Sequence, residues 1–179
     1  CTVYQWLDQS GNGNTATAAA PANEPTIYSS GVIEKKQGKL CLNFSGGEML
    51  AMTTPINHTA SFGIFSLNTV RANKFPFGGS DSFLFYAGST VLRYRGLLGD
   101  LNYNWQIPAQ GTRQLYSITR NPSNNAGLYI DGILGVSGIR TSDAFTGTIG
   151  DGQGSTGGRY DGNYQEFILY NTDKSGTDQ

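Results

Sequence analysis

The sequence predicts an all-β protein, built as a sandwich or barrel of antiparallel strands. Short runs of β-branched and aromatic residues alternate with glycine, asparagine, proline and serine along almost the whole chain. No long segment repeats apolar residues at the spacing of a helix. About a dozen short strands at this spacing are typical of a sandwich or barrel rather than of an α/β fold.

The first part of the chain is expected to hold short strands around one long loop. Strands are predicted near residues 2–6, 26–29, 31–35, 39–44 and 48–52. The segment TATAAAPANEP lies between the first two strands. It contains two prolines and no large apolar side chain, so we predict a loop there.

The second part of the chain is expected to hold longer strands joined by tight turns. They are predicted near residues 60–68, 82–87, 90–95, 101–106, 113–120, 127–131, 133–137, 145–149 and 163–170. QLYSITR and GLYIDG flank NPSNNA, and two β-rich runs around such a turn predict a hairpin. The dipeptide Asp131-Gly132 then predicts a second tight turn.

Composition restricts the classes of partner. The 179 residues suffice for one domain, and we expect residues 1–179 to be a single domain excised from a longer protein. The 12 Lys and Arg residues balance 13 Asp and Glu residues, and no run of like charge exceeds Lys35-Lys36, so no nucleic-acid partner is expected. No stretch approaches the roughly 18 apolar residues of a membrane span, so no membrane insertion is expected. The neutral surface, rich in hydroxyl and amide groups, suits an extracellular or virion-surface location and contact with sugars.

The two cysteines allow two states. Cys41 stands in KLCLNF, where a small buried apolar residue is expected, so a free thiol is favoured. A disulfide between Cys1 and Cys41 is the alternative.

The predicted hairpin and the last strand carry a family resemblance. YSITRNPSNNAGLYIDGILG and the later YDGNYQEFILYNTDKS resemble the concanavalin A-like lectin/glucanase superfamily, in its laminin-G-like branch. The opening WLDQSGNGNTATAAAPANEPTI looks like the N-terminal motif of these domains in bacteriophage structural proteins, and the arabinofuranosidase B-type catalytic domain begins similarly. The residues that fill the family's positions in the hairpin and last strand are Arg120, Leu128 to Gly132, Gly162, Glu166, Tyr170 and Asn171.

This resemblance implies a jelly-roll β-sandwich of two antiparallel sheets, in which the first and last strands are neighbours. The superfamily includes lectins, adhesion modules, glycosidases and inert capsid parts, so the fold alone does not decide the function. In family members the glutamate equivalent to Glu166 is usually a structural carboxylate. Laminin-G-like domains often bind one calcium ion at the rim of the sandwich.

The segment DQSGNGN has the spacing of a calcium loop over its first half. Position 12 of such a loop would be Ala19 instead of a glutamate, so a calcium site here would be weak. The alternative is a turn in which side chains cap their own backbone and Gly11 and Gly13 adopt positive φ angles. Asp81 and Asp151 are further calcium candidates in predicted loops. The weak calcium candidates in the segment itself are Asp8, Asn12 and Asn14.

Carbohydrate binding requires an exposed aromatic ring beside amide or carboxylate groups. Two segments, LNYNWQIP and GGRYDGN, offer this combination. The alternative is that Tyr103 and Trp105 line the core of the sandwich, as we also expect for Trp6. The carbohydrate-binding candidates are Tyr103, Asn104, Trp105, Arg159, Tyr160 and Asp161.

A catalytic role is not favoured. A retaining glycosidase needs two carboxylates about 5 Å apart, but Asp161 and Glu166 are five positions apart, so they would point to opposite faces of one strand. The single histidine, His58, lies in a predicted loop with no sign of a catalytic triad. We therefore expect a non-enzymatic module without a cofactor, with calcium as an option. Its partners would be glycans, a host surface or other virion proteins. A glycoside hydrolase fragment and a calcium-dependent adhesion module are the alternatives.

Overall fold

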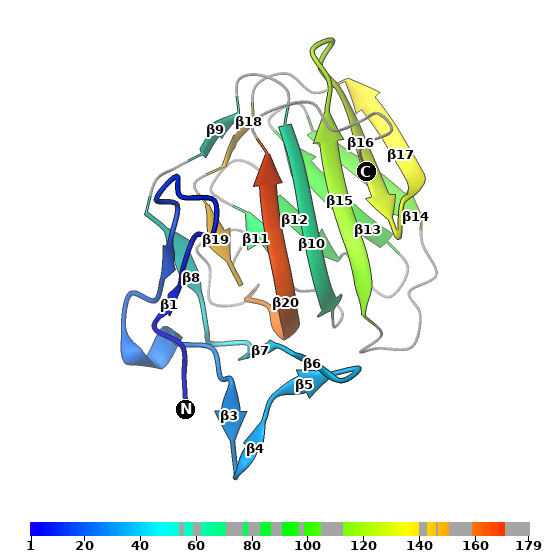
Figure 1. Cartoon of the computed structure of the whole chain (residues 1–179). Coiled ribbons are helices and arrows are strands. Elements are labelled where there is room, and N and C mark those ends of the chain that lie inside the picture. Colours follow the sequence, from blue (N-terminus) through cyan, green and yellow to red (C-terminus); the bar gives the residue numbers. More distant parts are fainter. Residues whose placement is uncertain are drawn as a thin grey trace.

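The chain is an antiparallel β-sandwich (Figure 1). The computed structural model describes residues 1–53, 56–58, 62–70, 77–78, 83–86, 91–96, 99–104, 113–139, 143–145, 147–150 and 159–170. Within these ranges the single helical element is a short 3-10 turn at Pro21–Asn23. No helix in the described ranges has the length and apolar character needed to cross a membrane. The prediction of an all-β, jelly-roll type of sandwich from two antiparallel sheets is confirmed.

One large sheet has six strands and contains the longest elements. β20 pairs with β10 along almost its whole length, but β7 covers only the Asp161–Tyr164 part of its other edge. The strands run in the order β17 (Ile133–Ile139), β16 (Asn125–Ile130), β15 (Gln114–Arg120), β10 (Phe62–Val70), β20 (Asp161–Tyr170) and β7 (Leu42–Ser45).

The other large sheet has eight strands, several of them only two residues long. Its first strand, β1, and its last, β14, lie at opposite edges. The strands run in the order β1 (Gln5–Trp6), β2 (Ala16–Thr17), β8 (Leu50–Met52), β19 (Thr148–Ile149), β11 (Phe77–Gly78), β12 (Phe83–Tyr86), β13 (Val91–Gly96) and β14 (Gly99–Asn104).

Two small hairpins project from the sandwich, at the bottom of the view in Figure 1. The first joins β3 (Tyr28–Ser29) to β4 (Val32–Ile33), and the second joins β5 (Lys35–Lys36) to β6 (Lys39–Leu40). Their turns place Ser30-Gly31 and Gln37-Gly38 at positive φ. Two successive positive φ values define the tight turn that matches the twist of a hairpin. A third pair joins β9 (Ile56–His58) to β18 (Asp143–Phe145).

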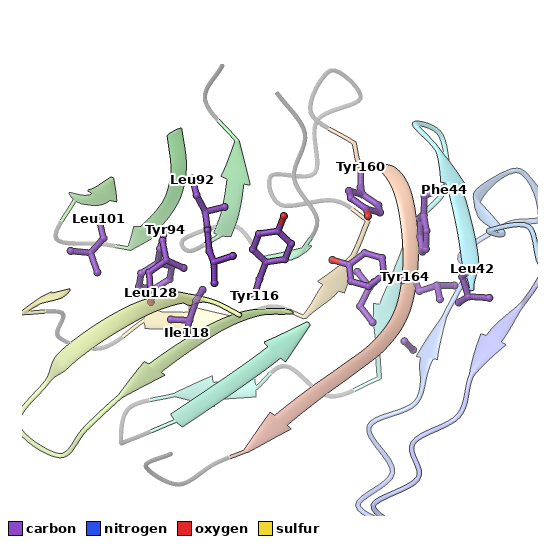
Figure 2. Packing of buried hydrophobic residues seen from close by; sticks show 14 of the residues in the cluster. Leu42, Phe44, Leu92, Tyr94, Leu101, Tyr116, Ile118, Leu128, Tyr160 and Tyr164 are labelled. Atoms are coloured by element: carbon purple, nitrogen blue, oxygen red, sulfur yellow. The ribbon is translucent and has the colours of Figure 1, made fainter. Parts of the chain in front are cut away.

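The core lies between the two large sheets (Figure 2). In β16, Ala126, Leu128 and Ile130 occupy alternate positions, and each is 0% exposed. This is the period of a strand with one face in the core. Leu92 and Tyr94 of β13 are equally buried and approach from the opposite sheet.

Three predictions about elements are corrected. The segment TATAAAPANEP is not a simple loop, because Ala16–Thr17 forms β2 between β1 and β8 and buries Ala16. The first and last strands are not paired neighbours, since β1 and β20 belong to different sheets. They meet instead across the sandwich, where the ring of Trp6 contacts that of Tyr164 edge-on at 6.4 Å. His58 ends a short strand rather than lying in a loop.

Both tight turns and the cysteine state match expectation. β15 and β16 form the predicted hairpin, and Asp131-Gly132 has the positive φ values of a tight turn. Cys1 and Cys41 are both free thiols. Cys41 is buried, and the loss of solvation raises the pKa of its thiol.

Candidate functional site

A groove of about 400 Å³ opens where the N-terminal segment faces β20. Its volume falls within the range of small-molecule sites, roughly 300–1,000 Å³. It combines amide, hydroxyl and carboxylate groups with an apolar floor. We call it the polar groove, and its lining residues are Trp6, Leu7, Asp8, Gln9, Ser10, Asn12, Asn14, Ala16, Met52, Ile149, Gln165, Glu166, Phe167 and Ile168.

The N-terminal wall of the polar groove is a turn organised by Asp8. One carboxylate oxygen accepts the N–H of Ser10 at 2.8 Å, and the other accepts the N–H of Asn14 at 2.9 Å. Gly11 and Gly13 take positive φ values that a residue with a side chain rarely adopts. The turn is therefore held by its own hydrogen bonds. Its residues Gln9, Ser10, Asn12 and Asn14 line the groove.

These hydrogen bonds also set the charge of the turn. The hydrogen bond from the Ser10 side chain, followed by those from the Asn14 and Ser10 amides, lowers the pKa of Asp8 from 3.8 to about 2. Each of them stabilises the ionised carboxylate more than the neutral acid. Asp8 is therefore an anion at every physiological pH.

The opposite wall is the second half of β20, which begins at a β-bulge. Leu67 of β10 pairs with Glu166 and Asn68 pairs with Tyr164, so Gln165 is the extra residue. A bulge reverses the inward and outward alternation of a strand. As a result Tyr164 is buried, Phe167 packs against the core, and Glu166 between them is exposed at the groove.

The floor of the polar groove is apolar. Trp6 is half-buried against the core and still lines the groove, whereas 59% of Leu7 is exposed. An apolar floor beside fixed amide and carboxylate groups suits a small polar ligand with one apolar face.

The groove contains two carboxylates, those of Asp8 and Glu166. A glycosidase requires one carboxyl group that gives up a proton at working pH. Asp8 does not meet this requirement, because its lowered pKa keeps it ionised and both of its oxygens already accept backbone N–H groups. Glu166 is then the one remaining acid among the lining residues.

The predicted calcium loop is the capped turn. Both oxygens of Asp8 accept backbone N–H groups, as the capped-turn alternative requires. A weak calcium site at Asp8, Asn12 and Asn14 stays a prediction. Among the described residues no group of three or more His, Cys, Asp or Glu could hold a metal ion. Asp81 and Asp151 lie outside the described residues.

The described residues among the predicted sugar-binding candidates do not line the polar groove, and the two predicted segments belong to different sheets. Tyr103 and Asn104 are on β14, at the far edge of the eight-stranded sheet from β1. The Tyr103 ring packs over Gly135 of β17, so close that a Cβ atom there would lie 2.1 Å from it. Asn104 is exposed, and Trp105 lies outside the described residues.

In the second predicted segment, Tyr160 belongs to the core and Asp161 begins β20, so these residues do not form an exposed platform. Tyr160 was expected to offer an exposed ring, but it is 0% exposed and contacts the rings of Phe44 at 5.7 Å and Tyr164 at 4.9 Å (Figure 2). Arg159 donates to the carbonyl oxygen of Gly47 at 2.5 Å. Asp161 is half-buried where β20 pairs with β7.

The sequence contains a signal for the groove wall that the sequence analysis missed. Tyr164 and Phe167 are three positions apart in a strand, although two residues on one face should differ by an even number. This spacing indicates a bulge, and a bulge brings Glu166 to the surface. The groove residues that were not among the predicted site residues are Trp6, Leu7, Gln9, Ser10, Ala16, Met52, Ile149, Gln165, Glu166, Phe167 and Ile168.

Comparison with known proteins identifies the fold. No protein-family model matches the sequence, and neither does any curated protein. Several solved structures are similar at low sequence identity. Domain 4 of AbnA, a GH43 extracellular arabinanase from Geobacillus stearothermophilus, matches with a TM-score of 0.60 at 14% identity, over 93% of this chain and 86% of that one.

Two larger proteins match over about half their length. A GH54 α-L-arabinofuranosidase has a TM-score of 0.68 at 14% identity, over 98% of this chain and 48% of that one. The binding domain of botulinum neurotoxin serotype C1 has a TM-score of 0.57 at 15% identity, over 96% and 47% respectively. These likenesses, at 14–15% identity, establish the β-sandwich fold.

Proposed function

We propose that this chain is a non-enzymatic carbohydrate-binding module that acts on an exposed surface. The observation that carries the proposal is the polar groove, in which Trp6 and Leu7 lie beside the amides of the Asp8 turn and the carboxylate of Glu166. A sugar ring has apolar C–H faces and a rim of hydroxyl groups. An apolar floor with amide and carboxylate groups around it complements both parts of the ring.

The structural neighbours support this class of ligand. Domain 4 of the arabinanase is in complex with arabinotriose, and cell entry of botulinum neurotoxin type C depends on interaction with two ganglioside molecules. Both ligands contain sugars, although the two proteins are otherwise unrelated in activity. The fold is thus used for carbohydrate recognition in proteins of different kinds.

A glycan array tests the proposal directly. We expect binding to at least one neutral sugar, with a loss of about fivefold to tenfold in affinity for Gln9→Ala or Asn12→Ala, each of which removes one hydrogen-bonding group. Gln5→Ala is the matched control, because Gln5 is exposed on β1 and does not line the groove. Failure to bind any glycan, or equal losses for all three variants, would contradict the proposal.

The location is a separate part of the proposal. A neutral surface rich in hydroxyl and amide groups is compatible with the outside of a cell or of a virus particle. There the module would decorate the particle or attach it to host glycans or to other surface proteins. Detection of the chain by labelled antibody on intact particles or cells, without permeabilisation, tests this location.

A glycoside hydrolase fragment is the second candidate. It is favoured by two carboxylates in one groove and by the likeness to the arabinofuranosidase, of which this chain spans about half the length. Against it stands the role of Asp8 in the turn, where both of its oxygens already accept backbone N–H groups. Assays on aryl-arabinofuranosides and arabinan decide between the two candidates. Turnover that Glu166→Gln abolishes would establish the enzyme, and absence of turnover with intact sugar binding would establish the module.

A further inference from the structure

A second hollow, of about 700 Å³, adjoins the polar groove at Gln165 and Glu166 of β20. We call it the basic hollow. The β5–β6 hairpin, the start of β15 and the middle of β20 form it. Its main lining residues are Ile33, Lys35, Lys39, Leu40, Arg113 and Glu166.

The charge of the basic hollow differs from that of the rest of the chain. Three of the five lysines in the sequence lie in residues 35–40, and two of them, Lys35 and Lys39, line the hollow. With Arg113 they outnumber the single carboxylate of Glu166, which gives a local net charge of +2 in a chain whose net charge is −1. Lys35 and Lys39 are exposed, so their ammonium groups are accessible to a ligand.

Gln165 fixes the shape of the basic hollow. Its side-chain nitrogen donates to the carbonyl oxygens of Lys36 at 3.0 Å and Lys39 at 3.2 Å. Its side-chain oxygen accepts a hydrogen bond from the guanidinium of Arg113 at 3.1 Å. One amide therefore ties the backbone of the hairpin and the guanidinium of Arg113 to the same point of β20, so both are held in place before any ligand arrives.

The two hollows adjoin each other. Gln165 and Glu166 line both of them, so adjacent units of one chain-like ligand could occupy the two hollows. The carboxylate of Asp8 and neutral hydrogen-bonding groups line one side of this boundary, and Lys35, Lys39 and Arg113 line the other.

We infer that the ligand is an acidic oligosaccharide. One neutral unit would occupy the polar groove, and a carboxylate or sulfate of an adjoining unit would bind Lys35, Lys39 and Arg113 in the basic hollow. This inference rests on the proposed function and adds the ligand's charge. A recessed site with positive groups around it fits a single anionic group on a flexible chain, whereas a flat anionic membrane would contact only the projecting edges of the hairpins.

The first experiment varies the charge of the sugar alone. Binding of oligogalacturonate is compared with that of its methyl ester, alongside a glycan array with neutral, uronate, sialylated and sulfated sets. We expect acidic glycans to bind at least about tenfold more tightly than neutral ones, and the preference to shrink as salt rises from about 50 mM to 500 mM.

The second experiment removes charge from the protein. In Lys35→Gln/Lys39→Gln we expect affinity for acidic glycans to fall by about tenfold to a hundredfold while binding of neutral glycans is unchanged. Lys36→Gln is the control, because it removes one positive charge from the same hairpin at a position that does not line the hollow, and Lys35→Gln and Lys39→Gln made singly match it in charge. Circular dichroism on all variants verifies that they are folded.

The outcomes separate this inference from the proposed function. Binding of neutral glycans without any preference for acidic ones would overturn the inference and leave the proposed function standing, whereas no glycan binding at all would overturn both. Vesicles of phosphatidylcholine with and without phosphatidylserine form the last arm. Lysine-dependent binding to the anionic vesicles in place of acidic glycans would assign the basic hollow to a lipid surface and overturn the inference.

Discussion

The β16–β17 hairpin and the β5–β6 hairpin share one turn design but differ in what surrounds them. Both close through two residues with positive φ, Asp131-Gly132 in one and Gln37-Gly38 in the other. In β16 the side chain of Leu128 is 0% exposed, whereas Leu40 in β6 is 57% exposed. The turn determines that a hairpin forms, but it does not determine what attaches the hairpin to the molecule.

The difference shows that two kinds of force hold this protein together. The body of the sandwich is fixed by close packing between sheets, as in β16. The β5–β6 hairpin and the Asp8 turn bury little apolar surface and are held by individual hydrogen bonds, among them those of Gln165 and Asp8. Both candidate binding hollows lie where these two regions meet.

The largest effect is expected from the same truncation made in both hairpins. Leu128→Ala should lower the free energy of unfolding by about 2–5 kcal/mol, because it leaves a cavity in the core. Leu40→Ala should change it by less than about 0.5 kcal/mol, because that side chain is already in contact with water. Urea unfolding followed by tryptophan fluorescence measures both, and equal losses would contradict the distinction between the two regions.

A second prediction adds a single methyl group. In Gly135→Ala the new Cβ would lie 2.1 Å from the Tyr103 ring, so the ring or β17 must move, at a cost of about 1–3 kcal/mol. Gly47→Ala is the control, since a Cβ at Gly47 has no neighbour within 4 Å among the described atoms. If both variants unfolded at the same urea concentration, the contact between β14 and β17 would not restrict the size of the side chain at position 135.

The sequence was sufficient to predict the body of the sandwich. Alternation in β16, the NPSNNA turn and the Asp131-Gly132 dipeptide are local signals, and a strand's own side chains determine which of its faces is buried. β2 was missed because Ala16-Thr17 has almost no strand signal of its own. It is a strand because β1 and β8 lie on either side of it.

The candidate site could be predicted only in part. The capped Asp8 turn follows from Asp, Asn and Gly at short spacing, so the local alternative to a calcium loop was available from the sequence. That Asp8 and Glu166 share one groove depends on how the sheets pack, which no local pattern encodes. The segment GGRYDGN has the composition of an exposed sugar-binding platform. Only the contacts of Tyr160 with Phe44 and Tyr164 place that ring in the core.

A third prediction tests the hydrogen bonds that hold the β5–β6 hairpin. Gln165→Ala removes the two bonds to the hairpin and the one to Arg113, each contributing about 0.5–1.5 kcal/mol at most. We expect a modest loss of global stability and a much larger rise in amide hydrogen exchange within residues 35–40. Gln5→Ala, on exposed β1, should leave exchange in the hairpin unchanged. Protection that persists in Gln165→Ala would show that the hairpin is held by something else.

The smallest effect is expected at the Asp8 turn, and it depends on pH. The pKa of Asp8 in the folded chain is about 2, below its ordinary value of 3.8, so the ionised carboxylate stabilises the fold. This contribution is complete above about pH 4 and is lost as the pH falls from about 4 to 2. Asp8→Asn should therefore melt at a lower temperature than the natural chain at pH 7, because its amide offers one oxygen to the two N–H groups that Asp8 binds with two. The difference in melting temperature should shrink toward pH 2, where the carboxylate also becomes neutral. A difference that stays constant from pH 7 to pH 2 would mean that the charge of Asp8 contributes nothing to holding the turn.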